Sequence, residues 1–101
     1  MRLAFWAAAG VGWSMEFEWD GNKAVANIEK HAIDFVDVVD VFEDGRLFVE
    51  VDGRFPEPRC RAIGMVEGVV LSVVYTMRGD VCRIISARRA SRRERRAYRS
   101  L

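Results

Sequence analysis

The 101-residue sequence is poor in histidine, cysteine and proline, with one, two and two residues of these types. The single histidine is His31, and Cys60 and Cys82 stand far apart in the chain. Because no Cys-x-x-Cys or His-x-x-x-His spacing occurs, a structural zinc site is unfavoured, and we expect neither a metal nor another cofactor. Isolated cysteines in strand-like runs are more typical of small buried hydrophobic residues than of a disulfide, which fits a reducing cytoplasm.

Long hydrophobic runs are also missing. The apolar stretch at the start of the chain, residues 1–14, is interrupted by Gly10 and Gly12 and is far shorter than the roughly 20 residues that span a membrane. We therefore expect no membrane contact. A chain of this length predicts one domain with one modest hydrophobic core.

Lysine is scarce, since fourteen of the sixteen basic residues are arginine. The formal net charge of +1 conceals an asymmetry between the two halves of the chain. Residues 16–57 carry twelve acidic and four basic residues, a balance of −8, whereas residues 59–101 carry eleven arginines and three acidic residues, a balance of +8. The planar guanidinium matches phosphate and carboxylate groups with two hydrogen bonds at once. A basic half of this kind favours a polyphosphate or an acidic protein as partner, although a solvated helix face gives the same pattern.

The densest positive charge lies between Arg83 and Arg99, where eight arginines accompany one acidic residue. Residues 83–88 alternate β-formers with polar residues, as in a strand. Ser91 and Glu94 then stand at the spacing of a capping box, in which each side chain accepts a hydrogen bond from a free backbone N–H at the start of a helix. The pattern predicts a strand that runs almost directly into a C-terminal helix.

Residues 1–14 differ from the rest of the chain, since they are apolar and carry one charge. A basic start followed by an apolar run resembles a signal peptide, but no convincing cleavage site of small residues follows. The favoured interpretation is an N-terminal extension outside the domain, with Met15 as the natural start. The expected domain is therefore residues 15–101.

The remaining elements follow from periodicity and capping. Residues 16–19 alternate polar and apolar side chains, as in a short strand. Asp20 is a suitable N-cap for a helix over residues 22–31, with Ala24, Val25, Ile28 and Ala32 on one face. Asp34 caps a second helix, in which Phe35, Val38, Val39 and Phe42 form the buried face and Gly45 supplies a left-handed cap.

Four strands are then expected, over residues 47–51, 59–66, 69–77 and 81–88. The third is almost continuously apolar, which predicts a central strand covered on both faces. Gly68 and Gly79 mark tight hairpin turns. The order of elements predicts an α+β fold: a short N-terminal strand and two helices packed on an antiparallel β-sheet, with a C-terminal helix.

An ordered set of motifs resembles a known family. The first half of the pattern is Phe17-Glu18-Trp19-Asp20, Lys23, Asn27, Lys30-His31, Phe35 and Val41-Phe42-Glu43-Asp44. The second half is Glu57-x-Arg59, Ile63-Gly64, Val74-Tyr75-Thr76, residues 83–88 and Glu94-Arg95-x-x-Tyr98. Together these motifs resemble the BrnT family of type II toxins, over residues 15–98.

The resemblance implies a RelE-like fold and a small bacterial, cytoplasmic ribonuclease toxin that inhibits translation. It implies a BrnA-like antitoxin with a ribbon-helix-helix element as the protein partner, so that contact with DNA is only indirect, through the antitoxin. It also implies cleavage of RNA without a metal, by attack of the ribose 2′-hydroxyl on the adjacent phosphate.

That chemistry requires a proton-transfer group and cations for the developing phosphate charge. Histidine is the side-chain type that titrates near neutrality, so His31 is the natural candidate for proton transfer, with Glu57 as an alternative base. Arg59, Arg83 and Arg88 are candidate phosphate ligands. Each has a structural alternative: His31 complements a helix dipole, Glu57 is a surface acid, and the arginines pair with the acidic helices.

Further RNA contacts are expected from the same two regions. Simple alternation places Arg83 on one strand face with Ile85 and Ala87, and Ser86 and Arg88 on the other with Ile84. The sequence leaves open which of these faces is covered. Tyr98 either anchors the C-terminal helix or stacks on a base. The residues expected to bind RNA are Lys30, Ser86, Arg92, Arg95 and Tyr98.

A second hypothesis is a catalytically inactive RelE-like module that binds nucleic acid or protein. Such a chain would keep the fold and the arginines but lose proton transfer. Toxicity on induced expression distinguishes the two hypotheses.

Overall fold

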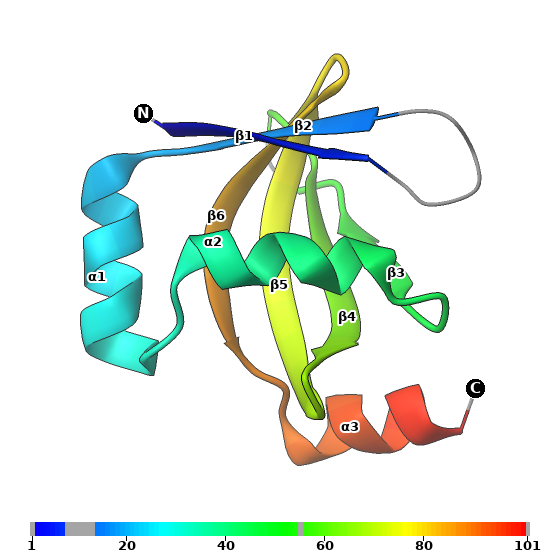
Figure 1. Ribbon diagram of the computed structural model, residues 1–101. Helices are drawn as coiled ribbons and strands as arrows, with labels where there is room; N and C mark the ends of the chain where they lie inside the picture. The colour runs from blue at the N-terminus through cyan, green and yellow to red at the C-terminus, as the bar shows by residue number, and fades with distance from the viewer. Residues whose placement is uncertain (1, 8–13, 55, 101) are drawn as a thin grey trace.

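The computed structural model describes residues 2–7, 14–54 and 56–100, and for residues 2–7 and 14 it describes only the backbone. It confirms an α+β fold (Figure 1). The elements in chain order are β1 (Arg2–Ala7), β2 (Ser14–Trp19), α1 (Gly21–His31), α2 (Phe35–Val38), the 3₁₀ helix η1 (Val39–Glu43), β3 (Phe48–Asp52), β4 (Arg59–Val66), β5 (Val69–Arg78), β6 (Val81–Arg89) and α3 (Arg92–Arg99).

The strands form one sheet in the order β1-β2-β6-β5-β4-β3. Strands β3 to β6 make the expected antiparallel meander, with β5 in its interior. The predicted antiparallel arrangement holds for these four strands, but β2 pairs with β6 in parallel. Parallel neighbours need a long connection between them, and here α1, α2, η1 and strands β3 to β5 all lie between β2 and β6. The sheet is therefore mixed.

Strand β1 lies at one edge of the sheet, antiparallel to β2. The sequence pattern predicts no element for this stretch, and the family motifs begin after it. Residues 2–7 thus form an edge strand of the sheet, while residues 8–13 lie outside the described residues. The domain boundary at Met15 stays a prediction that a shortened chain can test.

Both predicted hairpin turns are present. Glu67 and Gly68 have φ angles of 48° and 82°, and Gly79 has a φ of 61°. Two consecutive residues with positive φ give a turn whose twist matches that of the flanking strands, which is why short hairpins favour it. This holds for the β4–β5 connection, whereas in the β5–β6 connection Gly79 alone has a positive φ.

Helix α1 begins as predicted, with the Asn22 N–H donating to the Asp20 carboxylate at 3.0 Å. Of the predicted apolar face, Ala24 packs against the core, but Val25 and Ile28 are 56% and 44% exposed, and Asn27 is the buried residue of the helix. The helix lies at the edge of the sheet beside β6 (Figure 1), so its polar Asn27 side, rather than its apolar side, meets the strand.

The second predicted helix begins at its Asp34 cap but changes after four residues into the 3₁₀ helix η1. A 3₁₀ helix has three residues per turn, so Phe35, Val38 and Val41 point toward the sheet and are fully buried, whereas Phe42 is only partly buried. Gly45 does not have the predicted left-handed conformation, since its φ is not positive.

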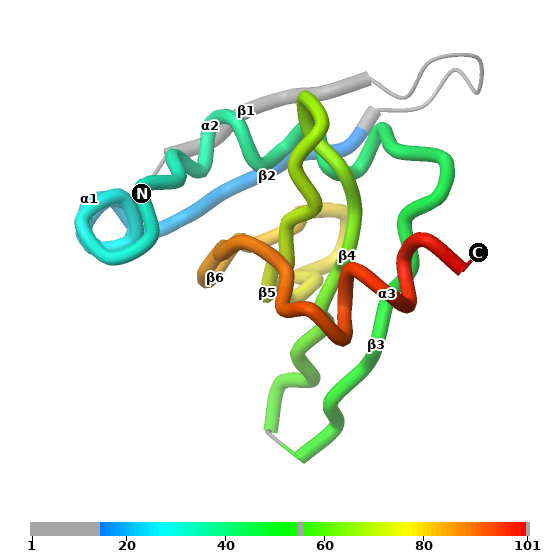
Figure 2. The backbone as a smooth tube through the Cα atoms, turned by 90° about the horizontal axis from the view of Figure 1, so that it is seen from below, coloured from blue at the N-terminus to red at the C-terminus, as the bar shows by residue number. Residues whose placement is uncertain are grey.

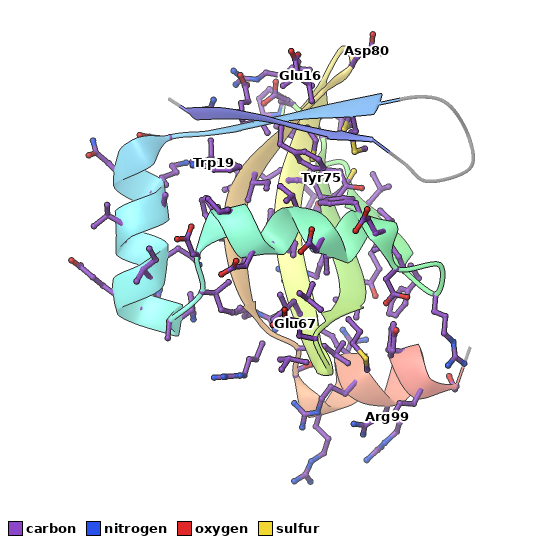
Figure 3. The ribbon with its side chains drawn as sticks, in the orientation of Figure 1. Glu16, Trp19, Glu67, Tyr75, Asp80 and Arg99 are labelled. Atoms are coloured by element: carbon purple, nitrogen blue, oxygen red, sulfur yellow. The ribbon has the colours of Figure 1, made fainter. Side chains whose placement is uncertain are left out.

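The main core lies between the sheet and the α2–η1 segment. Trp19 meets Phe35 edge-on at 6.0 Å between ring centroids, and Phe42 meets Tyr75 in the same way at 5.2 Å. Trp19 and Tyr75 lie in this layer (Figure 3). We call the opposite side of the sheet the open face. Helix α3 covers one end of it, over Ile63 and Val70 (Figure 2).

Candidate functional site

A β-bulge in β6 decides which side chains reach the open face. The register pairs Val74 with Ser86 but Tyr75 with Ile84, so Ile85 is an extra residue. An extra residue reverses the alternation of side chains beyond it. The predicted division of this strand is therefore wrong: Ile84 and Ala87 point into the core, and Arg83, Ser86 and Arg88 share the open face.

The strand register arranges these residues in rows across the open face. Arg83 lies between Glu18 of β2 and Thr76 of β5. Ser86 lies beside Val74, which in turn faces Arg61 of β4. The third row leads from Arg88 to Ser72 and Ile63, where α3 covers the sheet. Because strand backbones fix these positions, the cations of the first two rows are held in place before any ligand arrives.

Two hollows meet at the bulge. The larger one has a volume of about 270 Å³ and is lined by Asp52, Arg54, Arg59, Cys60, Arg61, Val74, Ile85 and Ser86. The smaller one has a volume of about 190 Å³ and is lined by Lys23, Ala26, Asn27, Lys30, His31, Ile85 and Ser86. They share Ile85 and Ser86, so we describe them together as the sheet groove. One side of this groove carries arginines, and the other carries His31 and two lysines.

Arg83 is positioned by an acid that the sequence analysis did not select. Its Nη1 lies 3.3 Å from Oε1 of Glu18, and the two side chains are only 18% and 14% exposed. Separating a partly buried pair of this kind would leave a poorly solvated charge, so the contact holds the guanidinium in place. The sequence held a signal for Glu18, because alternation with the apolar Phe17 and Trp19 places it on the face away from the core.

Arg88 is held by a second buried acid, Glu94, through hydrogen bonds of 2.8 and 3.1 Å. Burial alone would raise the pKa of Glu94, but hydrogen bonds from Arg88 and from the Ser91 backbone outweigh it and lower the pKa to about 2. Ser72 donates to Glu94 at 3.5 Å and accepts from Arg61 at 2.6 Å. One chain of contacts thus links β4, β5, β6 and α3, and Arg88 occupies its end.

Helix α1 places His31 and Lys30 at the border of the groove. Asn27 holds the helix there, because its side-chain oxygen accepts from the Ala87 N–H at 3.1 Å and its amide donates to the Ile33 carbonyl at 3.0 Å. The pairing of β2 with β6 extends only to Arg83. Beyond it, at Ala87, the Asn27 side chain accepts the hydrogen bond that a neighbouring strand would otherwise accept. His31 is partly buried in the last turn of α1.

The residues of the β3–β4 region fall into two groups. Arg59 is exposed and lines the sheet groove together with Arg54, which binds the Asp52 carboxylate and lowers its pKa to about 2. Glu57 is not among the residues lining either hollow. Its carboxylate instead pairs with Arg78, at 3.1 Å from the guanidinium Nε.

The candidate RNA-binding residues of α3 lie apart from the groove. Tyr98 is 5% exposed, and its hydroxyl donates to Asp44 at 2.6 Å, while Asp44 also accepts from the Met65 N–H at 2.7 Å. Burial opposes ionisation of Asp44, but these hydrogen bonds lower its pKa below the ordinary value. Of the two predicted roles of Tyr98, the geometry fits the helix anchor. Arg92 and Arg95 line a separate hollow on the helix.

Within the described ranges, no group of three or more histidine, cysteine, aspartate or glutamate side chains is placed to hold a metal ion. In the same part of the chain, no helix is long and apolar enough to cross a membrane. The groove instead brings together arginines, a hydroxyl, lysines and a histidine. Chemically, such a site can bind a phosphate group and transfer a proton beside it.

The fold and groove together define a small α+β protein with a preformed cationic site. The comparison with protein families makes the assignment specific: the family model described as "Ribonuclease toxin, BrnT, of type II toxin-antitoxin system" matches residues 19–94. The chain belongs to this family, which confirms the resemblance found in the sequence and implies an RNA substrate and an antitoxin partner. A search of curated proteins found no match.

Proposed function

We propose that this protein cleaves RNA in the sheet groove, by a reaction that needs no metal ion. The observation that carries the proposal is the bulge at Ile85, which turns Arg83 and Ser86 to the same face and joins the two hollows. Family membership supplies the class of reaction, and the groove supplies residue types that such a reaction requires.

The proposed reaction proceeds within one nucleotide. The ribose 2′-hydroxyl loses its proton and its oxygen forms a bond to the adjacent phosphorus, while the bond from phosphorus to the 5′-oxygen of the next nucleotide breaks. The leaving 5′-oxygen takes up a proton. The products are a 2′,3′-cyclic phosphate and a 5′-hydroxyl, and the phosphorane-like transition state carries extra negative charge that fixed cations stabilise.

Each groove residue receives a role that fits its position. Arg59 lines the groove and binds the reacting phosphate. Arg83, oriented by Glu18, lines neither hollow but lies beside them on the same open face, and it reaches that phosphate from the side. Ser86 lies at the junction of the hollows and donates a hydrogen bond to a phosphate oxygen. His31 accepts the proton of the 2′-hydroxyl and then gives a proton to the leaving 5′-oxygen, with Lys30 beside it for the neighbouring phosphate.

Two of the predicted catalytic residues receive lesser roles. Glu57 lies outside the lining of the groove, so we give proton transfer to His31. Arg88 is engaged by Glu94, and we assign it to holding α3 against the sheet rather than to direct phosphate contact.

We further propose the cellular setting that the family suggests. A BrnA-like antitoxin with a ribbon-helix-helix element keeps the toxin inactive and provides the only contact with DNA. Released toxin cuts RNA in the cytoplasm and so inhibits translation. Membership in a type II toxin family supports an antitoxin partner, and the basic half of the chain supports an RNA substrate.

The test is incubation of the purified protein with end-labelled RNA, in excess EDTA and reductant. We expect cleavage to continue under these conditions and to leave 2′,3′-cyclic phosphate and 5′-hydroxyl ends, identified by mass spectrometry. Loss of cleavage in EDTA with recovery on adding a divalent ion would overturn the proposed chemistry. RNA binding without cleavage would favour the inactive module.

A further inference from the structure

Helix α3 carries a second cationic hollow, separate from the sheet groove. Its volume is about 330 Å³, and its lining residues are Arg92, Arg95, Arg96 and Arg99. Positions i, i+3, i+4 and i+7 lie on one face of a helix, so the four arginines share one surface. Arg95 is held there by a hydrogen bond of 2.6 Å from its Nη1 to the Ala90 carbonyl. We call this surface the helix groove.

Among the residues that the structure describes, no acidic side chain lines the helix groove. The only acid of α3, Glu94, is 5% exposed and points inward, where it binds Arg88 and the Ser91 backbone. Among the described residues, Arg96 and Arg99 make no ion pair. Like charges at i, i+4 spacing destabilise a helix, so the arrangement lowers stability unless an anion occupies the groove.

The two cationic surfaces are physically distinct. The helix groove shares no lining residue with the sheet groove. Helix α3 lies at the end of the sheet opposite β2 (Figure 1), and Arg99 lies on the side of α3 away from the sheet (Figure 3). Arg95, Arg96 and Arg99 also fall beyond residues 19–94, the part that the family model matches.

The lining residues indicate what the helix groove binds. A protein segment bound in a pocket is usually held by apolar or aromatic anchors at its centre, and the helix groove is lined by arginine alone. The planar guanidinium of arginine binds phosphate oxygens through two parallel hydrogen bonds, so phosphate binding needs no apolar anchor. A single-stranded RNA backbone therefore fits this surface better than an acidic peptide does.

We propose that the helix groove is an exosite that binds phosphates of the RNA chain several nucleotides away from the bond that is cut. The proposal rests on the proposed ribonuclease function. It adds that the substrate must be long enough to reach from the sheet groove to α3. Long RNA gains affinity from the exosite, whereas a very short RNA occupies the sheet groove alone.

The test compares Arg96→Gln with Arg93→Gln on a trinucleotide and on a 25-nucleotide RNA. Both variants remove one charge from α3, but Arg93 does not line the groove. We expect Arg96→Gln to raise KM for the long RNA about threefold to tenfold and to reduce the salt slope of binding by about 0.7, with kcat unchanged. Arg93→Gln should have a clearly smaller effect, and neither variant should alter trinucleotide cleavage.

Thermal unfolding separates this role from a structural one. If Arg96 stabilises the fold, its replacement lowers Tm; if it serves only to bind RNA, Arg96→Gln leaves Tm unchanged or raises it at low salt by relieving repulsion. We expect the second result.

Four outcomes would overturn the exosite. They are an unchanged KM for long RNA, an equal loss on the trinucleotide, an equal effect of Arg93→Gln, and weakened inhibition by the antitoxin without any change in RNA binding. The last would assign the groove to an acidic protein segment. If the wild-type protein cuts no RNA, the proposed function fails, but fluorescence anisotropy with labelled RNA of both lengths still decides whether Arg96 binds the longer chain.

Discussion

The arginines of the sheet and those of the C-terminal helix belong to the same basic half of the chain but differ in how they are held. Arg83 and Arg88 each pair with a carboxylate that is mostly buried, Glu18 and Glu94. Arg96 and Arg99 are exposed and make no ion pair within the described residues. Strand β6 thus presents cations on the open face that buried carboxylates hold in place, whereas the surface helix presents mobile ones.

This difference separates two uses of positive charge. A cation fixed before the reaction stabilises developing charge without reorganising, which lowers the activation barrier. A mobile cation attracts any phosphate and is screened by salt, which changes affinity. We therefore expect substitutions in the sheet to change kcat and substitutions in the helix to change KM.

The largest effect should come from Arg83. Arg83→Ala should lower kcat for RNA cleavage about 10²- to 10³-fold, because it removes a positioned cation. Arg83→Lys should restore little, since lysine lacks the planar fork. Circular dichroism and antitoxin binding should be close to wild type. A folded and fully active Arg83→Ala protein would mean that the reaction does not take place at Arg83.

His31 should follow, with a loss of about 10²-fold in kcat for His31→Ala, typical of removing a proton-transfer group. The variant should also have a flatter dependence of kcat on pH. His31→Gln offers a control, because it keeps hydrogen bonding without titrating. Equal activity of wild type and both variants would leave His31 only a structural place at the end of α1.

The third prediction concerns Glu94, the buried acid that holds Arg88, and its contribution to the free energy of unfolding. Glu94→Gln should lower the free energy of unfolding at neutral pH by about 3 kcal/mol, because the native carboxylate has a pKa of about 2 against an ordinary 4.5. Since the folded pKa is the lower one, this contribution is complete above pH 4.5 and fades as the pH falls toward 2. Denaturant unfolding across pH 2–7 measures it. Glu29→Gln, at an exposed position of α1, is the matched control, and equal losses in both variants would contradict the account.

The smallest effect should come from shortening the chain to begin at Met15. The family match starts at residue 19, and β1 adds only an edge strand. We expect Tm to stay within about 4 °C of the full chain, which corresponds to roughly 1 kcal/mol for a domain of this size. A larger loss would show that β1 belongs to the domain. In the shortened chain, substitutions in the sheet should still change kcat and substitutions in the helix should still change KM.

Local sequence signals predicted much of the fold. The capping box at Ser91 and Glu94, the Asp20 and Asp34 caps and the two glycine turns are all present, because each depends only on residues a few positions apart. The predictions that failed concern features that tertiary contacts decide. A parallel partner for β2 and a 3₁₀ turn after Val38 are set by packing, which no local pattern contains.

The site was predictable only in part for the same reason. The sequence indicated arginines and His31, but strict alternation placed Arg83 on the wrong side of β6 relative to Ser86, because the bulge at Ile85 gives no distinct local signal. The partners Glu18 and Asn27 lie more than fifty residues from the groups they hold, Arg83 and Ala87. Such pairs become visible only when the chain is folded.

The most direct test of the central claim is to measure kcat and KM for Arg83→Ala and Arg96→Gln side by side on the same long RNA. We expect a fall in kcat of at least about 10² for Arg83→Ala, and an unchanged kcat with a raised KM for Arg96→Gln. If the folded Arg83→Ala protein loses only affinity while Arg96→Gln loses kcat, the reaction site lies on the helix and the account is contradicted.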